Sequence, residues 1–268
     1  MTGKLLARDC CERETMHDPP ISDLKAAHTA VAIQSRLSTQ PPQSYLRDFI
    51  YGGVDGVITT FAVVSGVAGA GLAGGIVIIL GAANLLADGF SMAVSNYLGT
   101  RAERERIERA RHIEGKHIDL YPEGEREEIR QIFAAKGFTT TELDHIVAVV
   151  TSDRSRWIDT MIQEEYGLRL EERSPLRAAA VTFCAFLSLG TLPLVAFLPA
   201  FFVADANFRP YLASTIFTAV SLFLVGAIKA RLVSRKWYRA GTETLVIGGA
   251  AASLAYFVGA LLASFAPS

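Results

Sequence analysis

Long stretches without a charged side chain constrain this 268-residue chain more than any other feature. Three stretches contain no Lys, Arg, Asp or Glu: 178–204, 210–228 and 244–268. Residues 49–100 contain only two charged side chains, Asp55 and Asp88. A helix that crosses the hydrocarbon of a bilayer needs about 20 mostly apolar residues. The overall charged fraction of 20% is therefore an average over very different regions, and the chain is predicted to be an integral membrane protein.

Five apolar segments are long enough to cross about 30 Å of hydrocarbon as helices. The predicted fold class is an all-α membrane protein with five transmembrane helices and a helical, metal-binding cytoplasmic insert between the second and third. A tight turn at 69–75 separates the first two spans. The predicted spans are 48–70, 72–98, 175–198, 211–230 and 242–265.

The basic residues predict the orientation of the chain in the membrane. Six Lys or Arg lie in 1–47, fourteen in 101–177 and five in 229–239, and Arg209 alone lies elsewhere. With five spans, the three basic groups fall on one side, and an excess of Lys and Arg marks the cytoplasmic side. The N-terminus and the insert are therefore predicted to be cytoplasmic, and the C-terminus to lie on the opposite side.

Four segments follow from these boundaries. They are a flexible cytoplasmic tail with a short helix at 21–38, the first two transmembrane helices, the cytoplasmic metal-binding insert, and the last three transmembrane helices. Their predicted ranges are 1–44, 45–98, 99–173 and 174–268.

The insert is predicted to be a small helical bundle. A charged helix at 98–119 is expected to continue the second span, followed by helices at 123–136, 140–151 and 153–166. Thr139 and Glu142 have capping-box spacing, and Ser152 is predicted to cap the last helix. Gly137 and Gly167 follow the second and fourth helices, as is common after helix C-termini.

Asp55 and Asp88 are functional candidates because an ionisable side chain inside a span is costly. Asp55 shares a helix face with Thr59, and Asp88 shares one with Met92. Carboxylates and a thioether suit a transition-metal ion of intermediate softness such as Fe²⁺. The alternative is that both acids only bond within the helix bundle and that Met92 only packs.

Two pairs of glutamates and one Met–Glu pair in the insert have helical spacing. Each pair lies on one helix face. Three such faces predict a site for several divalent cations, whereas interleaved arginines favour an ordinary solvated surface. The pairs are Glu105/Glu108, Glu125/Glu128 and Met161/Glu165.

Two Glu-x-x-His spacings also occur, Glu114/His117 and Glu142/His145. A di-iron centre in a four-helix bundle uses two such motifs and two further glutamates. This pattern keeps a membrane-anchored ferroxidase as an alternative. A third alternative is a metal-binding membrane scaffold or sensor that binds metal without transmembrane flux.

Three stretches resemble the vacuolar iron transporter (VIT) family, and they occur in the family's order, with a charged insert between spans two and three. They are YGGVDGVITT at 51–60, GAANLLADGFSMAVSNYL at 81–98 and WIDTMIQEEYGL at 157–168. The resemblance extends over about 45–265.

The resemblance implies a homodimeric transporter rather than an enzyme. Such a protein exports Fe²⁺, and often Mn²⁺, Zn²⁺ or Co²⁺, from the cytoplasm in exchange for protons. Its expected partners are divalent metal ions, protons and the lipid bilayer, with no nucleic acid and no prosthetic group, since the metal is the substrate. The expected location is a bacterial inner membrane, or a vacuolar membrane in a eukaryote.

The resemblance also implies roles for individual residues. Asp55 and Met92 correspond to ligands of the translocation pathway, to which Asp88 is added. Ile162 stands where a second methionine often follows Met161, and Asn84 stands where some relatives carry an acid. The metal-binding face of the insert corresponds to Glu105 (or Glu103 after a register shift), Glu108, Glu125, Glu128, Met161 and Glu165.

Overall fold

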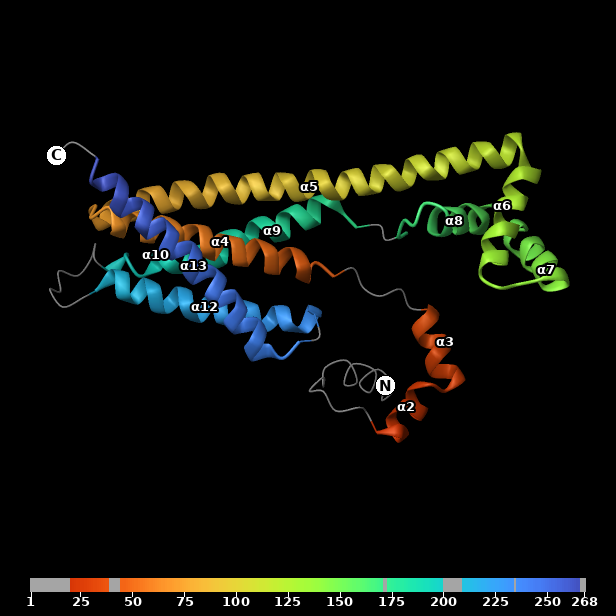
Figure 1. Ribbon diagram of the computed structural model, residues 1–268, viewed down its shortest axis with the longest axis horizontal. Helices are drawn as coiled ribbons and strands as arrows, with labels where there is room; N and C mark the ends of the chain where they lie inside the picture. Colours follow the sequence, from red (N-terminus) through yellow and green to blue (C-terminus); the bar gives the residue numbers. More distant parts are fainter. Residues whose placement is uncertain (1–19, 39–43, 171–172, 200–208, 234, 266–268) are drawn as a thin grey trace. The chain divides into compact units, whose positions relative to one another are not determined.

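The computed structural model describes residues 20–38, 44–170, 173–199, 209–233 and 235–265. Every regular element in these ranges is a helix, which confirms the predicted all-α class. Five helical segments are long and apolar enough to cross a membrane. Figure 1 shows them as the long helices of the ribbon. These segments are Leu46–Gly69, Gly74–Leu120, Pro175–Val195, Pro210–Ala230 and Trp237–Ala263.

The chain divides into two compact units. Unit 1 comprises residues 1–93 and 179–268, and unit 2 comprises residues 94–178. Helix α5 (Gly74–Leu120) belongs to both, because 47 residues form one helix without interruption. The second span and the first helix of the insert are thus a single helix, as predicted.

The first described elements are two short helices, α2 (Ile21–Ala27) and α3 (Ala30–Ser38). The single helix predicted at 21–38 is therefore broken, and the break lies at His28, whose backbone leaves the helical region at φ −106° and ψ 17°. The rest of the predicted flexible tail, at 1–19 and 39–43, lies outside the described residues.

The remaining helices of unit 1 follow the predicted spans closely. α4 is Leu46–Gly69, and Gly71 makes the turn to α5 with φ +67°, a conformation that glycine adopts readily. The third span is split into α9 (Pro175–Gly190) and α10 (Leu192–Val195), and Pro193 sits in the first turn of α10. The last two helices are α12 (Pro210–Val233) and α13 (Trp237–Ala263).

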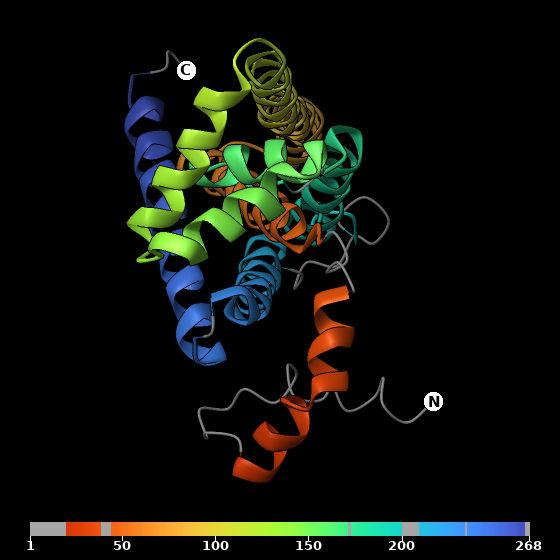
Figure 2. The same cartoon turned by 90° about the vertical axis from the view of Figure 1, so that its right-hand side faces the viewer.

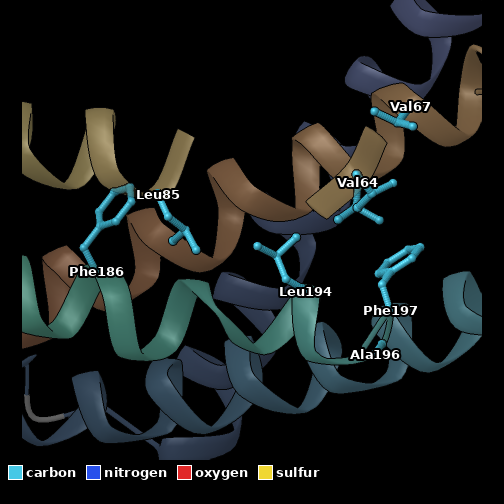
Figure 3. Close-up of a cluster of buried hydrophobic side chains, with 8 residues drawn as sticks. Val64, Val67, Leu85, Phe186, Leu194, Ala196 and Phe197 are labelled. Atoms are coloured by element: carbon cyan, nitrogen blue, oxygen red, sulfur yellow. The ribbon is translucent and has the colours of Figure 1, made fainter. Parts of the chain in front are cut away.

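A cluster of buried apolar side chains holds the elements of unit 1 together (Figure 3). Val64 and Val67 come from α4, Leu85 from α5 and Phe186 from α9. Phe186 and Leu85 point toward each other in the close-up. The other members of the cluster are Val77, Leu194, Ala196 and Phe197.

Glycines of α4 let its backbone approach α9 very closely. A Cβ atom at Gly52 or at Gly56 would lie 2.5 Å from a backbone carbonyl oxygen of α9, that of Thr182 or of Phe186 respectively. Small residues four apart permit this type of contact between membrane helices. The Gly52–Gly56 spacing is therefore a packing device.

Unit 2 is formed by the end of α5 together with α6 (Pro122–Ala135), α7 (Thr140–Thr151) and α8 (Arg154–Glu164). Figures 1 and 2 show α6, α7 and α8 as short helices that fold against one another. Their shared apolar core consists of Ile118, Ile129, Val147, Val150, Trp157 and Met161.

Polar contacts tie the helices of unit 2 at its surface. Arg154 bonds to both carboxylate oxygens of Asp119 and donates to the Gly115 carbonyl at 2.7 Å. Lys136 pairs with Glu164, which connects the end of α6 to α8. These contacts fix α8 against α5 and α6.

The helix ends of unit 2 correct two predictions. Asp153, rather than Ser152, caps α8, because its carboxylate accepts the Arg156 backbone N–H at 2.7 Å. The Thr139 side chain makes no capping hydrogen bond at the start of α7, so the predicted capping box does not form. Gly137 follows α6 with φ +98°, as predicted.

The contact between α4 and α9 gives a direct test. Gly56→Ala is expected to destabilise the protein by about 1–3 kcal/mol, because the added methyl group overpacks a backbone contact. The measurement is the temperature at which the full-length protein in detergent loses its monodisperse peak. Gly249→Ala is the control, since nothing lies within 4 Å of its Cβ position. Equal midpoints for both variants would contradict the close approach.

Candidate functional site

The two acids of the spans lie on neighbouring helices of unit 1. Asp55 is half-buried on α4, and the Thr59 hydroxyl donates to the Asp55 backbone carbonyl at 2.8 Å. Asp88 is exposed on α5, within electrostatic range of Asp55. Met92, one turn after Asp88, is half-buried against the apolar cluster of Figure 3.

The surroundings of Asp88 are unusual for a charged residue. Leu86 and Phe90, two residues to either side, are 60% and 65% exposed. They lie on the opposite side of α5, because residues two apart do not share a helix face, and the face of Asp88 instead carries Ser91 and Met92. An isolated chain would turn this carboxylate toward lipid, at a cost of about 2.5–3.5 kcal/mol near the bilayer centre.

Buried polar atoms without a hydrogen-bond partner also occur in unit 1. Among the described residues these include Thr60 Oγ1 on α4 and Asn84 Nδ2 on α5. Buried polar groups in proteins are nearly always paired, so each orphan needs an explanation such as an unseen water or ion. Both lie on the helices that carry Asp55 and Asp88.

A compact group of possible metal ligands lies in unit 2. Glu114, His117 and Glu125 each offer one ligand atom, and these atoms all lie within 4.8 Å of one another. Among the described residues, it is the one group of three or more His, Cys, Asp or Glu side chains that lie close enough together to hold a metal ion. We call it the acid–imidazole cluster. Chain geometry explains it: the Tyr121 backbone leaves the helical region, with φ −144° and ψ 66°, and Pro122 then begins α6 next to the end of α5.

The two carboxylates are buried and the imidazole is open. Glu114 is 1% exposed and Glu125 is 5% exposed, whereas the His117 side chain is 53% exposed. His117 Nδ1 lies 3.2 Å from Glu125 Oε1 and 4.0 Å from Glu114 Oε1. The Tyr166 hydroxyl donates to Glu114 Oε1 at 2.7 Å. The Oε2 atoms of both glutamates have no partner.

Burial and mutual repulsion hold protons on this cluster. Burial, and then the charges of Glu114 and Glu128, raise the pKa of Glu125 to about 7, while His117 opposes this rise. Burial and the same two glutamates raise the pKa of Glu165. Burial and the hydrogen bond to Glu114 raise the pKa of Tyr166. The acids of the cluster thus hold protons more tightly than exposed carboxylic acids do.

The structure brings together only some of the insert residues predicted as ligands. Glu125 belongs to the cluster, and Glu128 and Glu165 lie close enough to act on it electrostatically. Met161 is fully buried and packs in the apolar core of unit 2.

Glu105 and Glu108 do not reach the cluster. They are 58% and 59% exposed, and each accepts a hydrogen bond from an arginine one turn earlier, at 2.6 and 2.9 Å. Nine and six residues separate them from Glu114, which is about 13 and 9 Å along a helix with 1.5 Å per residue. Glu103, the register alternative, is also exposed and lies still further away.

Glu114 and His117 belong to the cluster, although they are not among the ligands that the resemblance implies. Their Glu-x-x-His spacing was the available signal, although it was interpreted as one half of a di-iron centre. The second such pair, Glu142 and His145, is exposed on α7 and does not belong to the cluster. The two pairs therefore do not form one centre in the described part of the chain.

Two carboxylates and an imidazole suit a divalent transition-metal ion. With that geometry established, comparison with known proteins decides the family. A family model described as the VIT family matches residues 46–260. The chain belongs to the VIT family. The resemblance carried by the three sequence stretches is thus confirmed.

Curated relatives cover most of this VIT family chain. The vacuolar iron transporter of Toxoplasma gondii is 30% identical over 230 residues, which is 84% of this chain and 76% of the relative. Vacuolar iron transporter 2 of Oryza sativa subsp. japonica is 30% identical over 212 residues, with coverages of 79% and 85%. Vacuolar iron transporter 1 of Arabidopsis thaliana is 30% identical over 214 residues, with coverages of 79% and 83%.

The raised pKa of Glu125 predicts a pH-dependent stability. Because the folded-state pKa is about 7 and the ordinary value is 4.5, the stabilising contribution is complete below pH 4.5 and is lost as the pH rises to 7. At pH 8, Glu125→Gln is expected to stabilise metal-free α6 against local opening by about 1–3 kcal/mol, since a poorly compensated buried charge is removed.

Hydrogen exchange of α6 peptides in the full-length protein, with chelator present, measures this effect. Wild type and variant are compared at pH 8 and at pH 5, where their protection is expected to converge. Glu127→Gln, an exposed acid on the same helix, is the control. A loss of protection at pH 8 in Glu125→Gln would contradict the assigned charge state.

Proposed function

We propose that this protein is an iron transporter that moves Fe²⁺ and related divalent metals out of the cytoplasm in exchange for protons. One observation carries the proposal: two carboxylates, Asp55 and Asp88, lie on adjacent membrane-spanning helices of a VIT family chain. Its curated relatives are named vacuolar iron transporters. The prevalence of Lys and Arg in the predicted cytoplasmic segments supports the orientation.

The acid–imidazole cluster is proposed to collect the metal from the cytoplasm. Its two free, buried carboxylate oxygens are ready acceptors for a cation, and the exposed ring of His117 leaves the cluster accessible. The further negative charge of Glu128 and Glu165 attracts any divalent ion. A local excess of metal at the membrane surface then feeds the translocation step.

Asp55, Asp88 and Met92 are proposed to form the translocation pathway. A thioether and carboxylates can bind Fe²⁺, as can Mn²⁺, Zn²⁺ and Co²⁺ to different degrees. The exposed position of Asp88 within a membrane-spanning helix supports a homodimer, because a second copy of the chain would shield this carboxylate from lipid. The unpaired atoms of Thr60 and Asn84 offer further polar contacts on the same helices.

Proton exchange follows from competition for one carboxylate. Asp55 can hold a proton or help bind a metal ion, but it cannot do both at once. A proton that enters from the opposite side and binds Asp55 would therefore release the metal, and loss of that proton toward the cytoplasm would restore the site. Inward proton movement in this way drives outward metal movement.

Transport through Asp55 is testable in proteoliposomes with a pH gradient. Asp55→Asn is expected to reduce Fe²⁺ flux to that of empty liposomes, because the amide binds neither the proton nor the metal as a carboxylate does. Glu243→Gln, an acid at the exposed start of α13, is the control and is expected to retain flux. Wild-type flux in Asp55→Asn would refute the pathway.

Metal binding distinguishes the two sets of acids in unit 2. The double variant Glu114→Gln/Glu125→Gln is expected to lose at least about tenfold in Fe²⁺ affinity of the full-length protein, measured under anaerobic conditions. Glu105→Gln/Glu108→Gln is expected to bind as wild type does, because those acids are exposed and paired with arginines. The opposite pattern would assign the site to Glu105 and Glu108.

A further inference from the structure

The acid–imidazole cluster contains one donor that differs in kind from the others. Glu114 and Glu125 offer oxygen, as do Glu128 and Glu165 nearby, whereas His117 offers a ring nitrogen. The softer thioether of Met161 is fully buried in the apolar core of unit 2. Among the described residues of the acid–imidazole cluster, His117 is therefore the only nitrogen donor, and nitrogen donors discriminate between divalent transition metals more strongly than carboxylates do.

We propose that His117 determines the metal specificity of the cluster and makes it favour Zn²⁺ and Co²⁺, and to a lesser extent Fe²⁺, over Mn²⁺. This inference rests on the proposed function, in which the cluster collects the transported metal. It adds a ranking of substrates, which carboxylates alone do not provide.

The position of His117 is suited to a ligand. The residue lies one helical turn after Glu114, so both side chains leave the same face of α5. Its Nδ1 is already 3.2 Å from Glu125 Oε1. A metal ion bound between these atoms would require small movements only, and the exposed ring gives the ion access from solvent.

The glutamates point to a cation independently of their charge. Glu114 Oε2 and Glu125 Oε2 are buried and accept no hydrogen bond from a neighbouring donor, so a proton shared between the two carboxyl groups or a bound cation is needed to satisfy them. Tyr166 occupies Glu114 Oε1 at 2.7 Å and thereby holds the side chain with Oε2 free. Two buried, unpartnered carboxylate oxygens beside an imidazole make a prepared site rather than a surface patch of acids.

The chemistry of the donors gives the ranking. Sites made only of oxygen suit Mg²⁺, Ca²⁺ and Mn²⁺, whereas imidazole suits Zn²⁺, Fe²⁺ and Ni²⁺. Affinity rises from Mn²⁺ through Fe²⁺ and Co²⁺ toward the later ions, and this rise is steeper with nitrogen than with oxygen donors. Glu128 and Glu165 attract all divalent ions alike, so they strengthen binding without changing the order.

The experiment compares metal affinities of full-length protein in detergent. Competition against a fluorescent chelator gives the Zn²⁺/Mn²⁺ and Co²⁺/Mn²⁺ affinity ratios for wild type, His117→Glu and His117→Gln, all in an Asp55→Asn background that removes the pathway carboxylate. His117→Glu makes the site all-oxygen, and is expected to lower both ratios about tenfold or more. His117→Gln is expected to weaken Zn²⁺ and Co²⁺ binding much more than Mn²⁺ binding.

A second readout separates a ligand from a residue that only pairs with Glu125. Co²⁺ bound to wild type is expected to show a visible absorption spectrum that changes in both His117 variants, because a nitrogen ligand has been lost. His112→Glu is the matched control, since His112 is an exposed histidine of the same helix. It is expected to leave the ratios and the spectrum unchanged.

Each outcome is decisive. In the first outcome, His117→Glu leaves the metal affinity ratios and the Co²⁺ spectrum unchanged, while Glu114→Gln/Glu125→Gln loses metal binding. This result would overturn the specificity role of His117 and leave the proposed function intact. Retention of all metal binding by Glu114→Gln/Glu125→Gln would overturn both the specificity role and the collecting step of the proposed function. Transport through Asp55 is judged separately by the flux assay.

Discussion

The cost of placing charge in hydrocarbon is the constraint on which this structure depends. An ionised side chain near the centre of a span costs about 2.5–3.5 kcal/mol, so the apolar part of each of the five membrane-spanning segments is almost free of charged residues. Asp55 and Asp88 are the exceptions on the first two spans. They are tolerated only if something compensates them, and the candidates are a metal ion, a proton and a second copy of the chain. Each of these is also part of the proposed transport cycle.

Unit 2 meets the same constraint in a milder form. Glu114 and Glu125 are as deeply buried as core residues, yet their Oε2 atoms have no hydrogen-bond partner. A protein that needed only stability would place apolar side chains there. The raised pKa of Glu125 reflects the free-energy cost of ionising a buried carboxylate beside other acids. Stability is thus reduced at a place where a cation would restore it, which is typical of a binding site.

The spans were predictable because hydropathy is a property of the linear sequence. Each observed span overlaps its predicted range, and the insert helices were found from Pro122, Gly137 and Gly167. It is harder to predict from the sequence which glutamates of α5 belong to the acid–imidazole cluster. Four glutamates of α5 have suitable spacing, and only the turn at Tyr121 decides which of them meets Glu125.

Part of that answer was nevertheless present in the sequence. Arg101 and Arg104 lie four residues before Glu105 and Glu108, a spacing that favours surface ion pairs. Ala110 lies four residues before Glu114, and Arg111, three residues before it, pairs with Asp159 instead. The hydrogen bond that Glu114 accepts from Tyr166 could not be predicted from local spacing, because the two residues lie 52 positions apart.

The contact between Tyr166 and Glu114 has a consequence for how the protein is made. The hairpin of α4 and α5 that carries Asp55 and Asp88 is synthesised first, whereas the cluster is complete only when the chain beyond α8 has emerged. A nascent chain therefore has its membrane carboxylates before the proposed metal-collecting site is complete. On the proposed function, the pathway acids are in place before the site that would supply them with metal has formed.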